Sequence, residues 1–521
     1  MSSLDQLRAL GRRIEEGLES SVERVTEELG GPARRRVIVL LACVLSVDAA
    51  DKGAVAALAF DLERGFHIGN TRVGLLVTVT SLVGALATVP FGQLVDRARR
   101  VRILWIGIVL WAAAQALSGL APDYAVLLAV RVGLGIVTAL AGPAVASLIG
   151  DLFPPRERGR IWGFILTGEV LGTGVGVLAS GLVSSWFGWR AAFVLLAVPS
   201  VALAWALRRW LPEPARGGQS RLEEGDTEIV SVEQAPDGDA PVAPDPAPEH
   251  EITPIEEFLE DEDIEPDPAI VIEDDPADMS LWQAIVYVLR VRTNIVLIVA
   301  SSLGYFFFAG LSTFAIIYVR GQYGLGQGLA SFVVVAVGVG IVVGLVVAGR
   351  VGDRLLSRGR VDSRLLLGVV GFVAAALVLA PALATSSLAI ALPLFVLAGA
   401  LVSAPNPGLD AARLDVVPAR MWGRAEAVRT LLRQTLEAFA PLIFGVVSEA
   451  FGGSSGGIGT GIDAKHAVVS YAQTHALQLT FLLMLVPVVA GGLVLLLGRR
   501  SYPVDVVSAR ESDRRIATPS S

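Results

Sequence analysis

Long apolar runs, separated by short charged or Gly- and Pro-rich stretches, dominate the pattern of this chain. Each run is long enough to cross about 30 Å of hydrocarbon as a helix that rises about 1.5 Å per residue. Twelve such runs occur, at 37–60, 71–94, 101–120, 124–150, 159–183, 189–211, 294–319, 328–349, 364–383, 387–409, 419–448 and 467–498. A polar stretch at 213–279 separates the first six from the last six. The pattern therefore predicts an all-α membrane protein with 12 transmembrane helices in two six-helix bundles.

Composition agrees with this prediction and excludes several classes of protein. Hydrophobic residues make up 53% of the 521 residues, charged residues make up 18%, and the mean hydropathy is +0.62, which is more apolar surface than a water-soluble enzyme could bury. The single cysteine, Cys43, excludes a disulfide framework, and the four histidines are too scattered for a metal cluster. The sequence contains no ATP-binding loop, hydrolase constellation or basic nucleic-acid patch. We therefore expect no enzymatic activity, cofactor, metal or nucleic-acid partner.

The net charge of −8 combines two regions of opposite sign. Residues 213–280 hold 23 Asp and Glu against two Arg, so the remaining chain carries a net charge of +13. Its arginines gather in alternate loops, such as 97–102, 156–160 and 350–360. Because cytoplasmic loops are enriched in Lys and Arg, we predict that both termini and the acidic stretch are cytoplasmic. The preference for Arg over Lys suggests a GC-rich bacterial genome, and hence a bacterial plasma membrane.

These boundaries divide the chain into five regions. We expect a cytoplasmic amphipathic helix within 1–34, an N-terminal bundle at 35–212, an acidic and mostly disordered linker at 213–279, a C-terminal bundle with a short cytoplasmic lead-in helix at 280–499, and a cytoplasmic tail at 500–521. Within the linker, Thr253-Pro254-Ile255-Glu256 forms a capping box that favours a short helix near 254–262. We interpret the linker as a solvated spacer that is dispensable for transport, with binding of a cytoplasmic partner as the alternative.

Two loop patterns recur in both halves. The pattern G-x-x-x-D-R is formed by Gly92, Asp96 and Arg97 and again, 257 residues later, by Gly349, Asp353 and Arg354. The pattern D-x-x-P-x-R-x-x-G-R begins at Asp151, with Arg156 and Arg160, and again, 264 residues later, at Asp415, with Arg420 and Arg424. Two different patterns in corresponding loops predict homologous bundles in parallel orientation, related by an axis along the membrane normal.

The first pattern, within Gly92–Arg100 and Gly349–Arg354, resembles the signature loop motif of the major facilitator superfamily. The resemblance implies the major facilitator fold. A loop aspartate can also lie at the positive N-terminus of a helix in the opposite half. Asp96 would then contact the start of the eleventh span, and Asp353 the start of the fifth. We therefore expect the loop residues of both patterns to form a cytoplasmic gate, with local capping by the aspartates as the alternative.

Several shorter runs resemble the Spinster-like branch of that superfamily. They are Phe66-His67-Ile68-Gly69, Val73-Gly74-Leu75, Asp151-Leu152-Phe153 and Arg424-Ala425-Glu426-Ala427. This resemblance implies proton-linked transport of amphipathic lipids, lysophospholipids and sphingoid phosphates among them. It also places Asp51 on the branch's helix-one aspartate, assigned to proton coupling, and Lys52 on the neighbouring arginine. Thr138 stands where the branch usually carries a helix-four glutamate.

Ionisable residues inside the predicted spans are candidate transport residues, because a charge in hydrocarbon is costly. Asp51 and Lys52 lie in the outer half of the first span, and Arg131 lies at comparable depth in the fourth. An Asp51–Arg131 or Asp51–Lys52–Arg131 cluster is therefore allowed, with a static ion pair as the structural alternative. Glu169 lies near the middle of the glycine-rich fifth span and could replace the glutamate missing at Thr138. We predict that Asp51 and Glu169 together provide proton coupling.

The second half contributes a further set of polar residues. Arg429, Arg433 and Glu437 share one face of the eleventh span at four-residue spacing. Arg433 either pairs with Glu437 or binds an anionic headgroup. Asn406, in the run Asn406-Pro407-Gly408, interrupts the tenth span near its inner end, where freed carbonyl groups could line a cavity.

Together these features predict a monomeric secondary transporter that uses alternating access. The expected substrate is small, amphipathic, anionic and lipid-like, and protons are the expected coupling ions. A proton-driven multidrug exporter suits the glycine-rich fifth span about as well. A membrane receptor or scaffold that no longer transports is an alternative from a different class.

Overall fold

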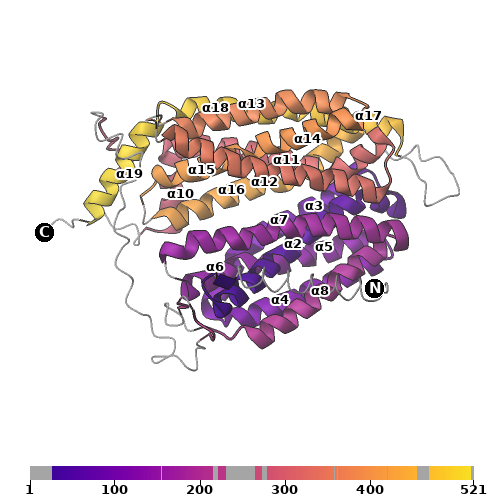
Figure 1. Cartoon of the computed structure of the whole chain (residues 1–521), viewed down its shortest axis with the longest axis horizontal. Coiled ribbons are helices and arrows are strands. Elements are labelled where there is room, and N and C mark those ends of the chain that lie inside the picture. Colours follow the sequence, from indigo (N-terminus) through magenta and orange to yellow (C-terminus); the bar gives the residue numbers. More distant parts are fainter. Residues whose placement is uncertain are drawn as a thin grey trace, which may run out of the picture.

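The computed structural model describes residues 26–27, 29–153, 155–214, 221–223, 225–229, 264–272, 279–356, 358, 360, 362–418, 421–453 and 469–517. Within these residues the regular elements are helices, and no strand is formed. The helices gather into two bundles that lie side by side, the N-half in indigo to magenta and the C-half in orange to yellow (Figure 1). This arrangement confirms the predicted all-α class and the division into two bundles.

The N-half holds the first six spans. Its helices are α2 (Pro32–Phe66), α3 (Asn70–Arg97), α4 (Arg100–Leu120), α5 (Tyr124–Thr138), α6 (Ala141–Leu152), α7 (Pro155–Phe187) and α8 (Trp189–Trp210). The C-half is built in the same way. Its helices are α10 (Leu281–Arg290), α11 (Arg292–Tyr323), α12 (Gln327–Leu356), α13 (Ser363–Ala384), α14 (Leu388–Ser403), α15 (Pro405–Asp415), α16 (Trp422–Ala450), α17 (Tyr471–Leu483), α18 (Leu485–Gly498) and α19 (Tyr502–Ala517).

Eleven segments of the described chain are long and apolar enough to cross a membrane. Helix α2 is not among them, because ionisable residues such as Asp48, Asp51 and Lys52 interrupt its apolar sequence. It is nevertheless 35 residues long and packs along the spanning helix α7. With α2 as the first span, the chain has the twelve spans that the sequence predicts.

Both halves break their fourth span at the same point. Helix α5 ends at Thr138 and α6 begins at Ala141, whereas α14 ends at Ser403 and α15 begins at Pro405. The tenth span is thus interrupted as predicted, but at Ala404 rather than at Asn406-Pro407-Gly408, which lie in the first turn of α15. The break in the fourth span was not predicted, since the apolar sequence there is continuous and contains only a Gly-Pro pair after the break.

Helix α7 lies unusually close to α2, because glycines line the contact. A Cβ atom on Gly168 would lie 2.7 Å from the carbonyl oxygen of Ala42, and the glycines one and two turns later meet the α2 backbone just as closely. Small residues at this spacing let two membrane helices pack backbone against backbone. The glycines of the fifth span therefore form the face of α7 that packs on α2.

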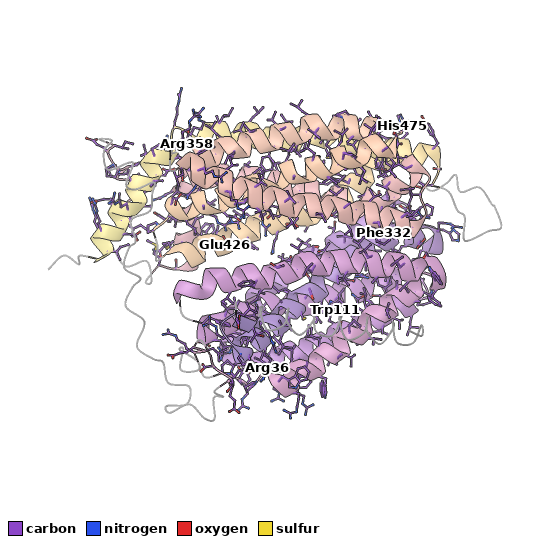
Figure 2. All side chains as sticks on the ribbon, in the orientation of Figure 1. Arg36, Trp111, Phe332, Arg358, Glu426 and His475 are labelled. Carbon is purple, nitrogen blue, oxygen red and sulfur yellow. The ribbon has the colours of Figure 1, made fainter. Side chains whose placement is uncertain are left out.

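The two halves meet at one end of the molecule. Figure 2 labels Arg36 and Arg358 at the end that carries most loop arginines, which we call the arginine-rich end, and His475 at the opposite end. Among the described side chains, hydrogen bonds and ion pairs between the halves lie near His475, so we call this the sealed end. Apolar contacts extend the join, with α3 packed on α16 and α7 packed on α12.

Two pieces of the acidic linker are docked on the bundles, in a stretch that we expected to be a mostly disordered, solvated spacer. In the first piece, Leu222 donates its backbone N–H to the carbonyl oxygen of Leu152 at 2.9 Å, and its side chain is 2% exposed. In the second piece, the backbone N–H groups of Asp267 and Ile272 donate to the hydroxyl oxygens of Ser508 and Ser512 on α19, at 2.8 and 3.0 Å. The predicted helix at 254–262 and most of the predicted N-terminal helix lie outside the described residues.

The docked pieces change the expected result of shortening the linker. We expect removal of 231–262 to leave the melting temperature in detergent unchanged, because these acidic, Pro-rich residues offer little apolar surface to bury. The Ile270→Asp substitution should instead lower the melting temperature, since Ile270 is 5% exposed and burying such a side chain is worth about 1.5–3 kcal/mol. Ala269→Asp, on the exposed neighbour, is the matched control. Equal melting temperatures for the two Asp variants would contradict the docking.

Candidate functional site

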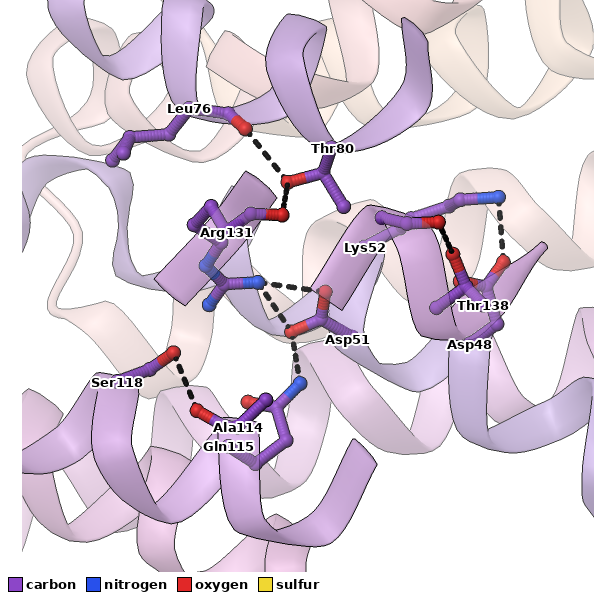
Figure 3. Close-up of polar contacts among 11 residues, drawn as sticks. Asp48, Asp51, Lys52, Leu76, Thr80, Ala114, Gln115, Ser118, Arg131 and Thr138 are labelled. Carbon is purple, nitrogen blue, oxygen red and sulfur yellow. Dashed lines mark hydrogen bonds and ion pairs between the residues drawn. The ribbon is translucent and has the colours of Figure 1, made fainter. Parts of the chain in front are cut away.

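A buried ion pair joins the first and fourth spans inside the N-half. The Arg131 guanidinium donates to both carboxylate oxygens of Asp51, at 2.7 and 2.8 Å, and both residues are at most 3% exposed. The Gln115 side chain on α4 donates a further hydrogen bond to Asp51 at 2.5 Å (Figure 3). The Phe193 ring covers the guanidinium at 4.9 Å. The structure thus contains the Asp51–Arg131 pair, which the similar depth of the two residues in their spans had allowed.

Lys52 does not join this pair. Its ammonium group turns to the other side of α2 and pairs with Asp48 at 2.8 Å (Figure 3). The Lys52 side chain is 54% exposed, whereas Asp51 is buried. The three-membered Asp51–Lys52–Arg131 cluster is therefore wrong, because successive residues of a helix point about 100° apart. Thr138 donates to the carbonyl oxygen of Gly135 in its own helix at 3.1 Å, and no hydrogen bond among the described residues joins it to either ion pair.

A second group of charges lies across the interface between the halves. Lys52 on α2 interacts electrostatically with Glu169 on α7 and with Glu437 on α16, and Glu169 also interacts with Arg433 on α16. We call these four residues the central charge group. Glu169 is exposed and Glu437 is half-buried. Glu169 and Arg433 lie 264 residues apart, the spacing of the second loop repeat, so an acid and a base occupy equivalent positions of the two halves.

Arg433 is held by an aromatic ring rather than by a carboxylate. Its guanidinium lies 4.1 Å from the centre of the Tyr305 ring on α11. Among the described residues it makes no ion pair within 4.0 Å, and its Nε atom is buried without a hydrogen-bond partner. The sequence left two alternatives open, an internal pair with Glu437 or binding of an anionic headgroup. Arg433 and Glu437 interact electrostatically, but no ion pair within 4.0 Å joins them among the described residues. Binding of a headgroup stays a prediction.

Arg429 has a different environment from Arg433. It pairs with Glu426 at 2.7 Å, one turn earlier on α16, and lies 3.9 Å from Asp410 on α15. Arg413 on α15 approaches Asp410 and Glu426 at 3.0 and 3.2 Å and closes this network. The predicted residue Arg429 is thus neutralised within the C-half. The side chain of Asn406, half-buried on α15, makes no hydrogen bond with another described residue.

The aspartates of the second loop pattern, Asp151 and Asp415, pair within their own halves at the arginine-rich end. Asp151 accepts from Arg100 at the start of α4, and Asp415 accepts from Arg364 at the start of α13. In the C-half, Tyr502 of α19 also donates to Asp415 at 2.5 Å. Burial, reinforced by the charge of Asp415, raises the pKa of Tyr502 well above its usual range, so its phenol remains a donor.

In the N-half, a carboxylate from the linker also contacts the start of α4. Glu213 accepts hydrogen bonds from the backbone N–H groups of Arg100 and Val101, each at 2.8 Å. These groups belong to the first turn of α4 and have no partner inside the helix. Glu213 therefore caps α4 and belongs structurally to the N-half, although the sequence placed it in the linker.

The predicted gate lies mostly outside the described side chains. This holds for Gly92, Asp96, Arg97, Arg156, Arg160, Asp353, Arg420 and Arg424. Of the remaining two gate residues, Arg354 is exposed, and a Cβ atom on Gly349 would lie 3.9 Å from Pro407. The gate therefore stays a prediction.

Some residues of the two charge groups were missed from the sequence. Gln115 carries no charge, so the search for ionisable residues within spans passed over it. Asp48 carries a charge and lies one turn before Lys52, a spacing at which ion pairs form on a helix. That spacing was the available signal. Within the described residues no group of three or more His, Cys, Asp or Glu could hold a metal ion.

Comparison with known proteins gives three results. The model of the Major Facilitator Superfamily matches residues 40–441. The "Probable L-galactonate transporter" of Escherichia coli (strain K12) is 28% identical over 167 residues, which are 32% of this chain and only 37% of that protein. Crystal structures of a bacterial homologue of the human lysosomal transporter Spinster share the fold. The inward-facing, unoccupied form has a TM-score of 0.70 at 19% identity, and the occupied form 0.66 at 20%, each covering 91% of this chain and 98% of the other.

Proposed function

Because the chain belongs to the major facilitator superfamily, with residues 40–441 matching the family model, we propose that it moves a small amphipathic anion across the membrane by proton-coupled alternating access. The central charge group carries this proposal. It brings two basic and two acidic side chains together between the halves: Lys52 and Glu169 from the N-half, Arg433 and Glu437 from the C-half.

In this mechanism the two bases hold the anionic group of the substrate. Arg433 is the stronger candidate, because Tyr305 orients its guanidinium and no described carboxylate neutralises it at contact distance. A guanidinium can bind a carboxylate or phosphate through two parallel hydrogen bonds. Lys52 is shared with Asp48 and contributes charge rather than a fixed geometry.

The acids supply the coupling. Glu169 is exposed, yet it lies among the charges of Lys52, Asp48 and Arg433, so its protonation changes the charge that a substrate meets. Asp51 is already bound by Arg131 and Gln115. We therefore assign the mobile proton to Glu169 and propose that Asp51 holds the first and fourth spans together around the site.

The substrate class is the finer part of the proposal. The Spinster resemblance supports an amphipathic lipid anion. The similarity to the probable L-galactonate transporter supports a second candidate, a hydrophilic sugar acid. Both carry one anionic group that Arg433 could hold. The proposed location is a bacterial plasma membrane with the arginine-rich end in the cytoplasm, because loop arginines mark that side.

Transport into proteoliposomes with an imposed pH gradient tests this function. We expect uptake of a lysophospholipid or a sugar acid, and no uptake of a cationic drug. The Arg433→Gln variant should raise the half-saturating concentration of the transported anion about 10- to 100-fold, since a hydrogen bond to a charged group is worth about 1.5–3 kcal/mol. Arg429→Gln is the matched control, because Arg429 is already paired with Glu426.

Three other results would each contradict a different part of this proposal. Uptake of the cationic drug alone would identify an exporter of the multidrug kind. Uptake of no probe, by protein that is correctly folded and reconstituted, would favour a receptor or scaffold. An equal effect of the two arginine substitutions would show that Arg433 has no special role in binding the anion.

A further inference from the structure

The sealed end joins the halves through equivalent positions of the repeat. Glu63 lies three residues before the end of α2, and Arg320 lies three residues before the end of α11. Asn70 and Gln327 are the first residues of the helices that follow, α3 and α12. Each pair is 257 residues apart, as in the first loop repeat. The seal therefore consists of two related patches, one built around Arg320 and one around Glu63.

The patch around Arg320 is balanced in charge. The Arg320 guanidinium lies 3.8 Å from the Asp61 carboxylate of the N-half and 4.3 Å from the centre of the Phe60 ring. It also donates to the side-chain oxygen of Gln327 at 2.6 Å. Gln327 in turn donates to the backbone carbonyl oxygen of Ala57 across the interface.

The patch around Glu63 contains a carboxyl group that pairs with no cation of the described chain. Glu63 is 1% exposed, and its Oε2 atom accepts a hydrogen bond from the Gln473 side chain of α17 at 2.7 Å. Its Oε1 atom is buried and has no hydrogen-bond partner among the described residues. Gln473 also approaches the Asn70 side-chain oxygen at 3.4 Å, and Asn70 donates to Ser448 at 2.9 Å. This chain of neutral groups crosses from one half to the other.

The other titratable groups described at this end do not neutralise Glu63. The charge that acts on it is that of Glu449 on α16, which is also negative and accepts from the Thr71 backbone N–H. On its own helix, Arg64 lies over the Phe60 ring at 6.0 Å. The two histidines that the structure describes, His67 and His475, are exposed, and His475 contacts Tyr471 and Gln478.

We propose that Glu63 is a proton-binding site that controls the seal, taking up a proton as the halves close over it and releasing the proton as they part. Burying a carboxylate that has no cation is costly, whereas the protonated acid carries no charge. Its Oε2 atom can accept from Gln473 in either form, and the unpartnered Oε1 atom carries the proton. When the halves separate, water hydrates the carboxylate and its charge is no longer penalised.

This inference rests on the proposed alternating access and adds a second proton site to it. The site is distinct from Glu169, because it belongs to the seal rather than to the central charge group. Only one of the two equivalent patches binds the proton, since Arg320 already pairs with Asp61 in the other. Acidic conditions are therefore expected to favour the sealed state.

The distance between the halves at this end can be measured without any substrate. Phe187 and Tyr471 are 76% and 84% exposed and belong to opposite halves, so spin labels at Phe187→Cys and Tyr471→Cys in a Cys43→Ser background report on the seal. In reconstituted protein, we expect the short-distance fraction to grow as the pH falls from about 8 to about 5, the range that also titrates histidines. Glu63→Gln should remain at short distance throughout, and Glu63→Asp should retain a response to pH.

Two control variants exclude the neighbouring titratable groups. Glu449→Gln and the double variant His67→Asn/His475→Gln should both keep the response of the wild-type protein. A wild-type protein without a pH response, a Glu63→Gln variant that keeps the response, or a histidine variant that loses it would each overturn the proposal. Uptake assays test the proposed function separately. If the seal responds to pH but the protein takes up no probe, the proposed role of Glu63 stands and the proposed substrate is wrong.

Discussion

The Arg131→Met substitution is expected to lower the free energy of unfolding by about 3–5 kcal/mol, because it leaves the Asp51 carboxylate buried with no cation. Asp51 is 3% exposed, and only the Gln115 amide would remain to stabilise its charge. Thermal denaturation in detergent micelles, followed by the loss of monodisperse protein on size exclusion, measures the change.

A neighbouring ion pair provides the matched control. Lys52→Met removes a cation from a pair whose side chains are 54% and 28% exposed, and such pairs contribute about 0–1 kcal/mol. The double variant Asp51→Asn/Arg131→Met should recover most of the lost stability, since it leaves no unpaired charge. Equal losses for Arg131→Met and Lys52→Met would contradict the buried pair, as would a double variant no more stable than the single one.

The fold could be predicted almost completely because each of its causes is local in the sequence. A span needs only a long apolar run, and α11 and α12 provide such runs without interruption. The repeated loop patterns then relate the two halves. Helix α2 was predicted as a span although its ionisable residues weaken the apolar signal, because the residues on either side of them are apolar.

The candidate site could be predicted only in part. The position of a residue along a span gives its depth in the membrane, but it does not give the direction in which the side chain points. Depth placed Asp51 level with Arg131, and the structure joins them. It placed Lys52 at the same level, but the helix turns Lys52 toward the interface between the halves. The partners of Glu169 come from α2 and α16, so their approach depends on how the helices pack.

The contacts of the seal and of the linker could not be predicted, because they join residues that are far apart in the sequence. Glu63 meets Gln473, which lies 410 residues later, and no local pattern marks either residue as a partner. The docked pieces of the linker are short, and an apolar run such as Ala269-Ile270-Val271-Ile272 is flanked on both sides by acidic residues. A composition that predicts disorder over the whole stretch therefore hides a few residues that pack on each half.

The Glu169→Gln variant is expected to lose accumulation driven by a pH gradient while it keeps exchange of substrate across the membrane. Gln fills the same space but cannot carry a proton, so binding by Arg433 and movement of the halves should persist without coupling. A gradient of about one pH unit supports about tenfold accumulation for each coupled proton, and this factor should fall to one. Proteoliposomes loaded with buffer measure accumulation, and proteoliposomes loaded with unlabelled substrate measure exchange.

The other acid of the central charge group separates coupling from a general effect of charge. Glu437→Gln removes a carboxylate that also interacts with Lys52, so it changes the local field in a similar way. If Glu169 carries the proton, Glu437→Gln should retain accumulation above the level without a gradient. Asp51→Asn should impair both accumulation and exchange, because it disrupts the buried pair with Arg131. Full accumulation by Glu169→Gln would assign the proton elsewhere, and loss of accumulation in Glu437→Gln alone would place the carrier on α16 in the C-half.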